Sequence, residues 1–391
     1  MRLLDRYLLR ELLVPLVYCL AGFFIFWVSF DLFSGLEDFQ RRHLTFGEIL
    51  LYYVVTSPEQ ISLVMPIALL LGMLYALTNH SRHNEVTAMR AAGISLWRLS
   101  APYFGVGLVF AVICFLLNEL WVPRSEERGE DILLGHTQPG GNAAGRFWHT
   151  NVVFTNHREG RTNTWHLVRY HSRTHEMDGP TVISEDTAGE RHRITALEPM
   201  ADNGAALVQI SARRGIYTNG AWLFQSASIM SFTNLSNPVP RIERSEELLL
   251  KGFSDPPAFI DSEIRVSSLT AIRAAKRPQL SLREIANYLA LHDHLEPAQR
   301  ALIETQWQCR LAAPWTCVVV VLIALPFGAA TGRRNVFVGV AASIFICFAY
   351  FVLQRIGLSL GVGGHLSPWI AGWLPNIAFG AAGFWLMSRV R

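Results

Sequence analysis

Histidines are the first residues in this sequence at which chemistry could be expected. Two histidines and an aspartate occupy 292–294, and further histidines stand at His166, His171 and His175. Histidines spaced in this way on a polar strand usually form a solvated face, so we expect no metal site. The sequence contains no GxxxxGK[ST], HExxH or G-x-S-x-G motif, which argues against a P-loop, a zincin and a hydrolase nucleophile. We therefore expect no catalytic residue and no cofactor in this chain.

Ionisable side chains inside apolar stretches would mark a path for ions. Asp31, Glu59 and Glu119 lie near the ends of such stretches, and Arg355 lies at the outer end of another. None of them is a carboxylate near the middle of a stretch, which a proton- or sodium-driven transporter normally needs. If the protein moves a substrate, we expect the energy to come from a partner.

Six apolar stretches dominate the sequence. Hydrophobic residues make up 51% of the 391 residues and charged residues only 17%, against about a quarter in soluble proteins. The charge deficit is confined to 12–33, 61–78, 102–121, 311–330, 336–354 and 369–387. Each stretch is long enough to cross roughly 30 Å of hydrocarbon as a helix. The sequence therefore predicts a six-helix transmembrane bundle. Because no basic patch is interleaved with aromatics, nucleic acid is not an expected partner.

Arginines in the short loops predict the orientation. They gather before the first span, between the second and third, between the fourth and fifth, and after the sixth: Arg2, Arg6, Arg10, Arg82, Arg90, Arg98, Arg333, Arg334, Arg389 and Arg391. We expect this side to be cytoplasmic, with both termini. The large insert at 122–308 is then expected on the periplasmic side.

Two shorter segments flank the first spans. Residues 1–11 have Leu and Arg at helical spacing, which predicts an amphipathic helix at the cytoplasmic interface. Residues 44–57 are apolar and aromatic but short. They form either an outer interfacial helix before Pro58 or the start of a longer, tilted second span, and the two interpretations are equal.

The insert has the pattern of a β-domain followed by helices. Turn signals such as Asp178-Gly179 and Asn219-Gly220 separate short stretches rich in β-branched and aromatic residues. These stretches are FWHTNVVFT, TWHLVRYHS, TVISED, HRITALEPM, AALVQISARRGIYTN and AWLFQSASIMSF. Such strands predict a sandwich or jelly roll. From Ser281 onward, helical spacing broken near Pro297 predicts two short helices.

The loop at 79–101 is the most informative segment. Val86, Met89, Ala92 and Leu96 can share one helical face, and Glu85 suits the first turn of a helix. Small residues that allow another surface to approach stand at Ala88, Ala91, Ala92 and Gly93. These residues predict a short helix at about 83–97. It either docks into a groove of a cytoplasmic motor or rests on lipid headgroups.

In this loop, NEVTAMRAAGISLWRL closely resembles the cytoplasmic loop of the LptF/LptG family of lipopolysaccharide export permeases, also called the YjgP/YjgQ family. LDRYLLRELLVPL, LPFGAATGRR and PWIAGWLPN are similar to further parts of that family, and so are HRITA and ARRGIYTNGAWLFQSA in the insert. The resemblance covers essentially the whole chain. DLFSGLEDF, after the first span, is more similar to the LptG branch.

The resemblance implies a multi-pass protein of the bacterial inner membrane with an inserted periplasmic β-jelly-roll domain. We expect a first membrane half at 1–121, the β-jelly-roll domain at 122–265, a helical connector at 266–308 and a second membrane half at 309–391.

The family also implies a function in transport rather than catalysis. Two such permeases pair, a cytoplasmic ABC ATPase dimer with ATP and Mg²⁺ drives them, and lipopolysaccharide leaves the outer leaflet through β-jelly-roll domains. The implied partners are an LptF-like second permease, a single-span LptC-like jelly-roll subunit and an LptA-like periplasmic bridge. The implied coupling residues are Glu85, Val86, Met89, Arg90 and Gly93.

By the same resemblance, the first and fifth spans form a lateral gate for lipid. From their positions in the spans, we expect a lipid site formed by Phe24, Trp27, Arg41, Arg42, Phe351 and Arg355. The LptG branch tends to place basic residues nearer the outer end of the first span. Here that region is acidic, at Asp31, Glu37 and Asp38. Anchoring at lipid headgroups is therefore an equal interpretation for Arg41 and Arg42.

Two other functions compete with this one. A membrane-bound enzyme acting on lipid needs converging acid–base residues, and the outer loops contain no persuasive pair of carboxylates near a histidine. A mechanotransmitting subunit, which relays ATPase motion to a periplasmic partner without moving lipid, needs the same coupling helix. It does not need a lipid-sized cavity between the first and fifth spans.

Overall fold

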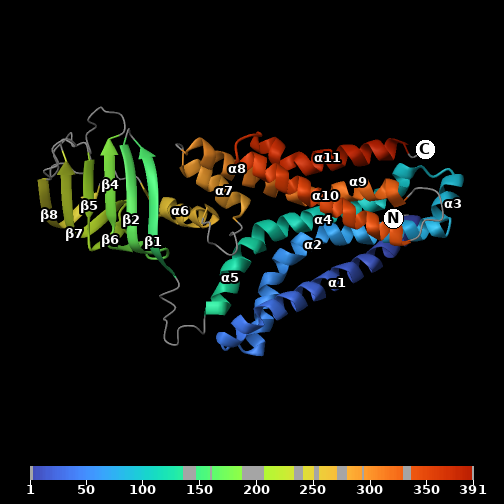
Figure 1. Cartoon of the computed structure of the whole chain (residues 1–391), viewed down its shortest axis with the longest axis horizontal. Helices are drawn as coiled ribbons and strands as arrows, with labels where there is room; N and C mark the ends of the chain where they lie inside the picture. The colour runs from blue at the N-terminus through green and yellow to red at the C-terminus, as the bar shows by residue number, and fades with distance from the viewer. Residues whose placement is uncertain are drawn as a thin grey trace. The chain divides into compact units, whose positions relative to one another are not determined.

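The computed structural model describes residues 3–134, 147–158, 161–186, 207–232, 241–250, 255–270, 280–292, 295–328 and 336–389. The chain forms two compact units, one of helices and one containing all the described strands (Figure 1). The membrane unit comprises Met1–Gln138, Gln279–Ala286 and Glu296–Arg391. The β unit comprises Pro139–Pro278 and Asn287–Leu295.

Long apolar helices build the membrane unit, as hydropathy predicts. Among the described residues, six helices are long and apolar enough to cross a bilayer. They are α1 (Leu3–Arg41), α2 (Phe46–Arg82), α4 (Leu96–Leu116) with its continuation, α8 (Pro297–Ala312) joined to α9 (Thr316–Gly328), α10 (Val336–Val362) and α11 (Pro368–Arg389). The prediction of six spans is confirmed.

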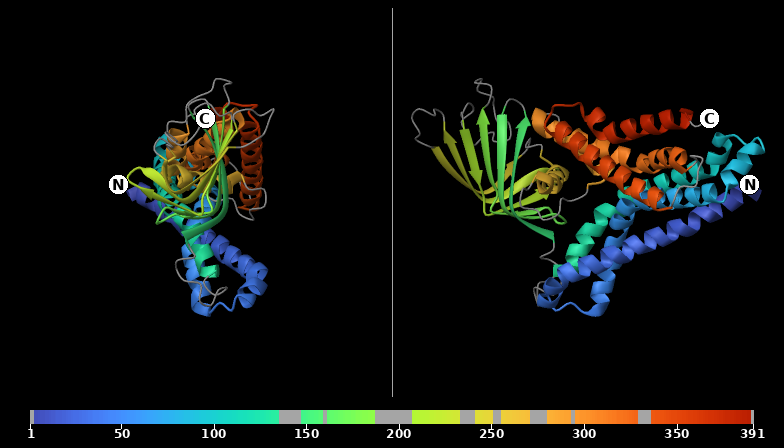
Figure 2. Two further views of the ribbon diagram at one scale, coloured as in Figure 1. Left: turned by 90° about the vertical axis from the view of Figure 1, so that its left-hand side faces the viewer. Right: turned by 45° about the vertical axis from the view of Figure 1, so that its right-hand side comes forward.

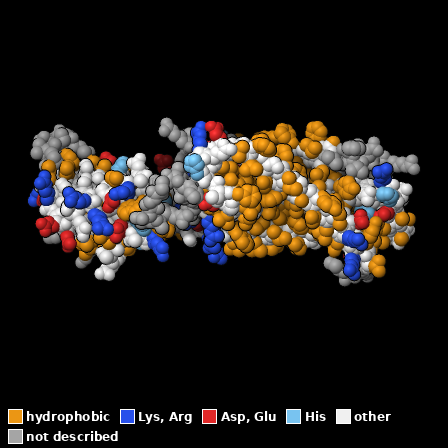
Figure 3. Space-filling model, turned by 90° about the horizontal axis from the view of Figure 1, so that it is seen from below, with side chains coloured by type: hydrophobic (Ala, Val, Ile, Leu, Met, Phe, Trp, Pro, Cys, Tyr) orange, Lys and Arg blue, Asp and Glu red, His pale blue; other side chains and the backbone are white. Residues whose placement is uncertain are grey.

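The surface of the membrane unit is apolar where lipid would cover it. Phe26 and Phe30 of α1 and Phe345 and Phe348 of α10 are 66–74% exposed. On the face shown in Figure 3, hydrophobic side chains cover the middle of the unit and charged side chains lie toward its ends. A continuous apolar surface of this kind would cause aggregation in water, so it marks contact with a membrane.

Two helices are longer than the sequence predicts. Residues 1–11 do not form a separate helix, because α1 is continuous from Leu3 to Arg41. Residues 46–57 belong to α2, which decides in favour of the longer second span. α2 bends along its course (Figure 1) and contains Pro58 and Pro66, each of which removes one backbone hydrogen bond.

The insert begins and ends at different residues than expected. The third span continues through a π-helical turn at Leu117–Trp121 into α5 (Val122–Leu134), so helix occupies the first part of the expected β-domain. The fourth span begins at Pro297, inside the expected connector at 266–308. Both extensions are charged enough to resemble soluble protein, yet they continue helices that are already formed.

α1 packs closely along α2. Leu8, Leu12 and Leu16 of α1 are at most 1% exposed. A Cβ at Gly72 of α2 would lie only 3.1 Å from the Cα of Leu16. Small residues at crossings let membrane helices approach to backbone contact. A larger residue at position 72 would therefore push α1 away.

The β unit contains one antiparallel sheet. Its described strands are β1 (Trp148–Arg158), β2 (Arg161–His171), β3 (Glu176–Asp178), β4 (Thr181–Asp186), β5 (Leu207–Ser211), β6 (Arg214–Thr218), β7 (Ala221–Phe232) and β8 (Arg241–Leu250). β1 pairs with the outer edge of β2 and β8 with the outer edge of β7. Two short antiparallel pairs, β4–β5 and β3–β6, connect β2 to β7. β4 and β3 pair with successive parts of β2, and β5 and β6 pair with successive parts of β7. The expected inserted β-sheet domain is thus confirmed.

A boundary, here called the seam, runs across the long strands of this sheet and separates the pair β4–β5 from the pair β3–β6. The β1–β2 ladder is interrupted at Asn151 (φ 55°) and the β7–β8 ladder at Ser226 (φ 53°). Such interruptions bend strands and re-aim their side chains. The halves on either side of the seam pack face to face, with Trp165 centred 6.4 Å from Trp222 and 6.2 Å from Phe224. The sandwich is therefore one sheet folded on itself, and Figure 2 shows its curvature.

A helix completes the core of the β unit. Phe259 and Ile260 of α6 (Pro257–Thr270) are at most 1% exposed and pack into the core of the sheet. Just before α6, Asp255 is 2% exposed. Its carboxylate accepts a hydrogen bond from Trp165 Nε1 at 2.9 Å, and its carbonyl accepts one from Trp222 Nε1 at 2.8 Å.

Most predicted strands are present. β1, β2, β4, β5, β6 and β7 lie in the predicted stretches, whereas HRITALEPM at 192–200 lies outside the described residues. The pair Arg333–Arg334 also lies outside them. The predicted helices after Ser281 are α7 (Leu282–Leu291) and α8. Neither β8 nor α6 was predicted.

Candidate functional site

The predicted helix of the 79–101 loop is α3 (Glu85–Ala91). It ends in a Schellman motif: Gly93 N–H donates to the carbonyl of Arg90, and Ile94 N–H donates to that of Met89. Gly93 has φ 82°, a conformation that glycine adopts without strain. Two residues later, Ser95 Oγ accepts a hydrogen bond from Arg98 N–H and caps α4. The turn after α3 is therefore fixed on both sides.

One face of α3 packs inward and the other is exposed. Val86 is 2% exposed, and Met89 and Leu96 pack against the core of the membrane unit. Ala92, expected on the same face, is exposed instead. The outward residues of this segment are small: Thr87, Ala88, Ala91, Ala92 and Gly93. Of the implied coupling residues, Arg90 is half-buried.

Glu85 is held inside the membrane unit. Tyr7 Oη of α1 lies 3.1 and 3.0 Å from the two carboxylate oxygens of Glu85. His80 Nδ1 of α2 lies 2.6 Å from Glu85 Oε2. Close by, Arg98 of α4 forms an ion pair with Asp5 of α1 at 3.0 Å. Nothing in the local pattern around Tyr7 and Asp5 indicates partners 78 and 93 residues away. His80 lies five residues before Glu85, but on a different helix, so helical spacing does not predict their contact.

Phe24 and Trp27, expected at the lipid site, lie on α1, and Trp27 packs against α2. The rings of Phe24 and Trp27 lie 5.8 Å apart, and Trp27 meets Tyr53 edge-on at 5.7 Å. Tyr53 Oη donates to the carboxylate of Asp31 at 3.1 Å. Asp31, one of the acidic residues noted at the end of the first span, therefore ties α1 to α2.

Arg41 and Arg42, at the C-terminal end of α1, already have protein partners. Arg41 pairs with Glu37 at 2.7 Å, and the Arg41 side chain is 72% exposed. Arg42 donates to the carbonyl of Leu133 at 3.0 Å. Arg41 remains accessible to an anion, whereas Arg42 fastens α5 to α1.

Phe351 and Arg355 lie on α10. Phe351 meets Tyr350 edge-on, and Arg355 is exposed. Tyr350 Oη donates to Asn376 at 2.8 Å and lies 2.7 Å from Thr316 Oγ1, a buried polar network that joins α10 to α9 and α11. Within the described residues, no hydrogen bond, ion pair or ring contact joins the expected lipid-site residues near α1 to those on α10.

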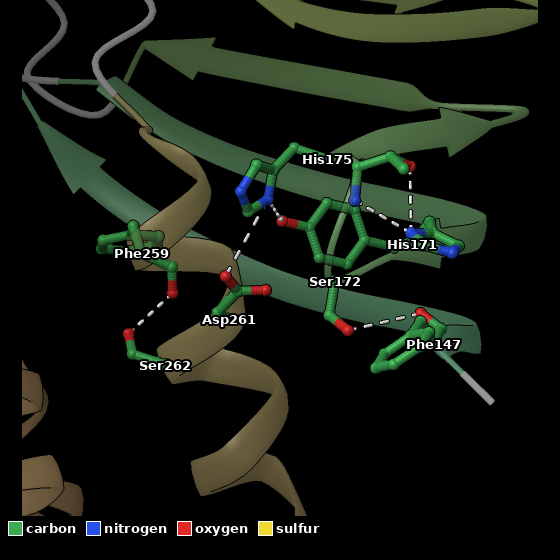
Figure 4. A network of polar contacts seen from close by, with 9 residues as sticks. Phe147, His171, Ser172, His175, Phe259, Asp261 and Ser262 are labelled. Carbon is green, nitrogen blue, oxygen red and sulfur yellow. Dashed lines mark hydrogen bonds and ion pairs between the residues drawn. The ribbon is translucent and has the colours of Figure 1, made fainter. Parts of the chain in front are cut away.

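Two of the histidines singled out in the insert, His171 and His175, have protein partners. His171 Nδ1 accepts the backbone N–H of Thr174 at 3.0 Å. His175 Nδ1 lies 3.1 Å from Tyr170 Oη and 4.0 Å from the carboxylate of Asp261 (Figure 4). His166 is exposed on β2. In the part of the chain that the structure describes, no three His, Cys, Asp or Glu residues are grouped to hold a metal.

Two comparisons with known proteins identify relatives of this chain. A relative, the lipopolysaccharide export system permease protein LptG of Haemophilus influenzae, is 30% identical over 77 residues. That segment covers 20% of this chain and 22% of the relative, so the match spans about a fifth of the relative's length. The model of the family described as lipopolysaccharide export system permease LptF/LptG matches residues 6–389. With its six apolar helices and inserted β-sheet, the chain therefore belongs to the LptF/LptG family of lipopolysaccharide export permeases.

Proposed function

We propose that this chain is a permease subunit of an ABC-type lipopolysaccharide export complex. The complex extracts lipopolysaccharide from the outer leaflet of the inner membrane and passes it to a periplasmic β-jelly-roll bridge. ATP and Mg²⁺ are bound by a separate cytoplasmic ATPase, and this chain needs no cofactor. The observation that carries the proposal is α3, a short helix with a fixed turn and a small-residue outer face.

This outer face suits contact with a second protein. Thr87, Ala88 and Ala91 are exposed, so a partner can approach close to the backbone of α3. The Schellman motif at Gly93 fixes the segment before any partner binds. A surface that is already ordered loses little conformational entropy on binding. These properties favour docking to a motor over resting on headgroups.

The orientation follows from the arginines of the short loops. Both termini and α3 are cytoplasmic, and the β unit is periplasmic. The partners are then a cytoplasmic ABC ATPase dimer, an LptF-like second permease, a single-span LptC-like subunit and an LptA-like bridge.

The lipid path is proposed along α1 and α10. Phe26 and Phe30 on α1 and Phe345 and Phe348 on α10 present apolar surface that acyl chains can contact. Arg41 and Arg355 are exposed and can meet a phosphate, although Glu37 competes for Arg41. The alternative, a mechanotransmitting subunit that moves no lipid, shares α3 and needs no such path.

The test is co-purification of the tagged chain from native membranes, with mass spectrometry of bound proteins and lipids. We expect an ATPase, a second six-span permease and lipopolysaccharide. An ATPase without lipopolysaccharide would favour the mechanotransmitting subunit. A chain that is recovered without any ATPase would refute the proposal.

Matched substitutions locate the contact. Ala88→Trp puts a large side chain on the outer face of α3 and should reduce the recovered ATPase at least about tenfold, since 1.4 kcal/mol is already a factor of ten. Ala101→Trp is the control, because Ala101 is exposed on α4 outside the α3 segment. Equal recovery with both variants would remove α3 from the interface.

A further inference from the structure

Three helices meet at the carboxylate of Glu85, the first residue of α3. Tyr7 reaches it from α1, with Oη 3.0 Å from Oε2, and His80 reaches it from α2, with Nδ1 2.6 Å away. The rings of Tyr7 and His80 lie 5.7 Å apart. The side chain of His80 is 2% exposed and that of Glu85 is 34% exposed. Most of the Glu85 side chain is therefore turned into the protein rather than toward a partner.

His80 makes this contact through one of its two ring nitrogens. Its Nε2 is buried and has no hydrogen-bond partner among the described residues. Among the described residues, the polar contact of this ring is therefore the one between Nδ1 and Glu85 Oε2, at 2.6 Å.

A second tie fastens α1 just beyond α3. Arg98, in the first turn of α4, pairs with Asp5 of α1 at 3.0 Å. Tyr7 thus fixes α1 to the first residue of α3, and Asp5 fixes it to the beginning of α4. Farther along the same helix, Asp31 accepts a hydrogen bond from Tyr53 of α2.

α1 can act as a lever because the helix continues past Pro15 from Leu3 to Arg41. Its 39 residues correspond to roughly 58 Å at 1.5 Å per residue, well beyond a bilayer core of roughly 30 Å. A force on α3 that moved Glu85 would pull on Tyr7 and shift the whole helix. The same helix carries the exposed Phe26 and Phe30, which lie on the proposed lipid path.

We propose that Tyr7 is a positioning residue that couples α3 to α1 through Glu85, while His80 holds the same carboxylate to α2. This inference rests on the proposed function and deepens it: Glu85 is the internal anchor of the docking helix, and the exposed small residues make the contact with the motor. Removing the Tyr7 hydroxyl should then uncouple ATP hydrolysis from lipid movement without preventing docking.

The first experiment compares Tyr7→Phe with Tyr18→Phe in the complete complex reconstituted into vesicles containing lipopolysaccharide. Tyr18 lies on the same helix and is 71% exposed. Tyr18→Phe should bind the ATPase and hydrolyse ATP at wild-type rates, and Tyr7→Phe should still be recovered with the ATPase and hydrolyse ATP. For Tyr7→Phe, we expect lipopolysaccharide released per ATP to fall about tenfold, the effect of losing one hydrogen bond to a charged group. Tyr18→Phe should match the wild type.

The second experiment needs no partner. Amide hydrogen exchange of residues 85–92, measured on the full chain in lipid nanodiscs, should be about tenfold faster in Tyr7→Phe because α3 loses an anchoring hydrogen bond. Tyr18→Phe should leave this exchange unchanged.

Two results would overturn the inference. If Tyr7→Phe equals Tyr18→Phe in exchange and in lipid released per ATP, Tyr7 does not position α3, whatever the protein does. If Tyr7→Phe loses the ATPase outright, the hydroxyl belongs to the docking surface and does not couple. A third result is distinguishable from these two. If the wild-type complex contains no ATPase or no lipopolysaccharide, the proposed function is refuted together with the coupling role of Tyr7.

Discussion

The indole N–H of Trp165 donates to the carboxylate of Asp255 over 2.9 Å, inside the core of the β unit. The side-chain amide of Asn156 donates to the other carboxylate oxygen. Asp255 is 2% exposed, so these donors have no water to replace a lost acceptor.

Asp255→Asn should therefore destabilise the β unit. An amide presents an N–H to one of the two donors, and an unmet buried hydrogen bond costs about 1–3 kcal/mol. The measurement is urea unfolding of the full chain in detergent, followed by tryptophan fluorescence. The control is Asp178→Asn, which breaks the surface pair with Arg169 and should cost under about 1 kcal/mol. Equal effects would contradict the assigned role of Asp255.

Asp261 gives the β unit a dependence on pH. Burial raises the pKa of its carboxyl above the ordinary value, although His175, Arg265 and His149 attract its charged form and Tyr170 donates a hydrogen bond to it. A carboxyl whose pKa is higher in the folded state stabilises the fold fully below the unfolded pKa of about 3.9. This stabilisation is lost as pH rises through the folded pKa.

Asp261→Asn removes that titration. We expect the melting temperature of the variant, relative to that of the wild type, to increase from pH 4 to pH 7. Near-ultraviolet circular dichroism of the full chain during heating measures it. A difference between the two proteins that stays constant with pH would show that Asp261 titrates alike in both states.

Glu119 helps α7 to begin. Its carboxylate accepts the backbone N–H groups of Leu282 at 2.9 Å and Arg283 at 3.3 Å, next to a reciprocal cap between Ser281 and Glu284. Glu119→Ala should loosen this end of α7 by about 1 kcal/mol, the usual effect of losing an N-terminal cap. Tryptic cleavage after Arg283 should then be about fivefold faster, while cleavage after Arg300 in α8 should stay the same. Unchanged cleavage at Arg283 would show that the cap from Ser281 suffices.

Gly93 needs its left-handed backbone. Gly93→Ala should strain the turn after α3 by about 1 kcal/mol and weaken ATPase binding about fivefold. Gly93→Asn should be milder, because Asn tolerates positive φ. Gly105→Ala on α4 is the control, since a Cβ there meets no atom within 4 Å. Binding that ranks Ala above Asn at position 93 would argue against a role for the turn.

Hydropathy predicted the six spans because bilayer thickness dictates their length and composition. The same signal missed the continuation into α5, whose charged sequence continues a helix already formed. β8 was missed because most of RIERSEELLL is polar, and only Leu248 and Leu250 are buried. α6 was missed because its role is tertiary: Phe259 and Ile260 fill a core made by distant strands.

In the candidate site too, local features could be predicted from the sequence and long-range contacts could not. The small residues of α3 and the glycine at its end are visible in the sequence, since both are local. The contact of Glu85 with Tyr7 is not, because Tyr7 is 78 residues away and follows no periodic signal. The arginines near the end of α1 were noticed for their charge, but only the fold shows that Arg42 is used on a backbone carbonyl.

The seam through the β-sheet determines how that domain could change shape. β1, β2, β7 and β8 all cross it, so the two halves cannot separate as independent sheets without breaking four strands. A wider interior would come from a change of angle at Asn151 and Ser226, with the ladders on either side intact. The energetic barrier to such opening would therefore be set by aromatic contacts, chiefly those of Trp165, rather than by backbone hydrogen bonds.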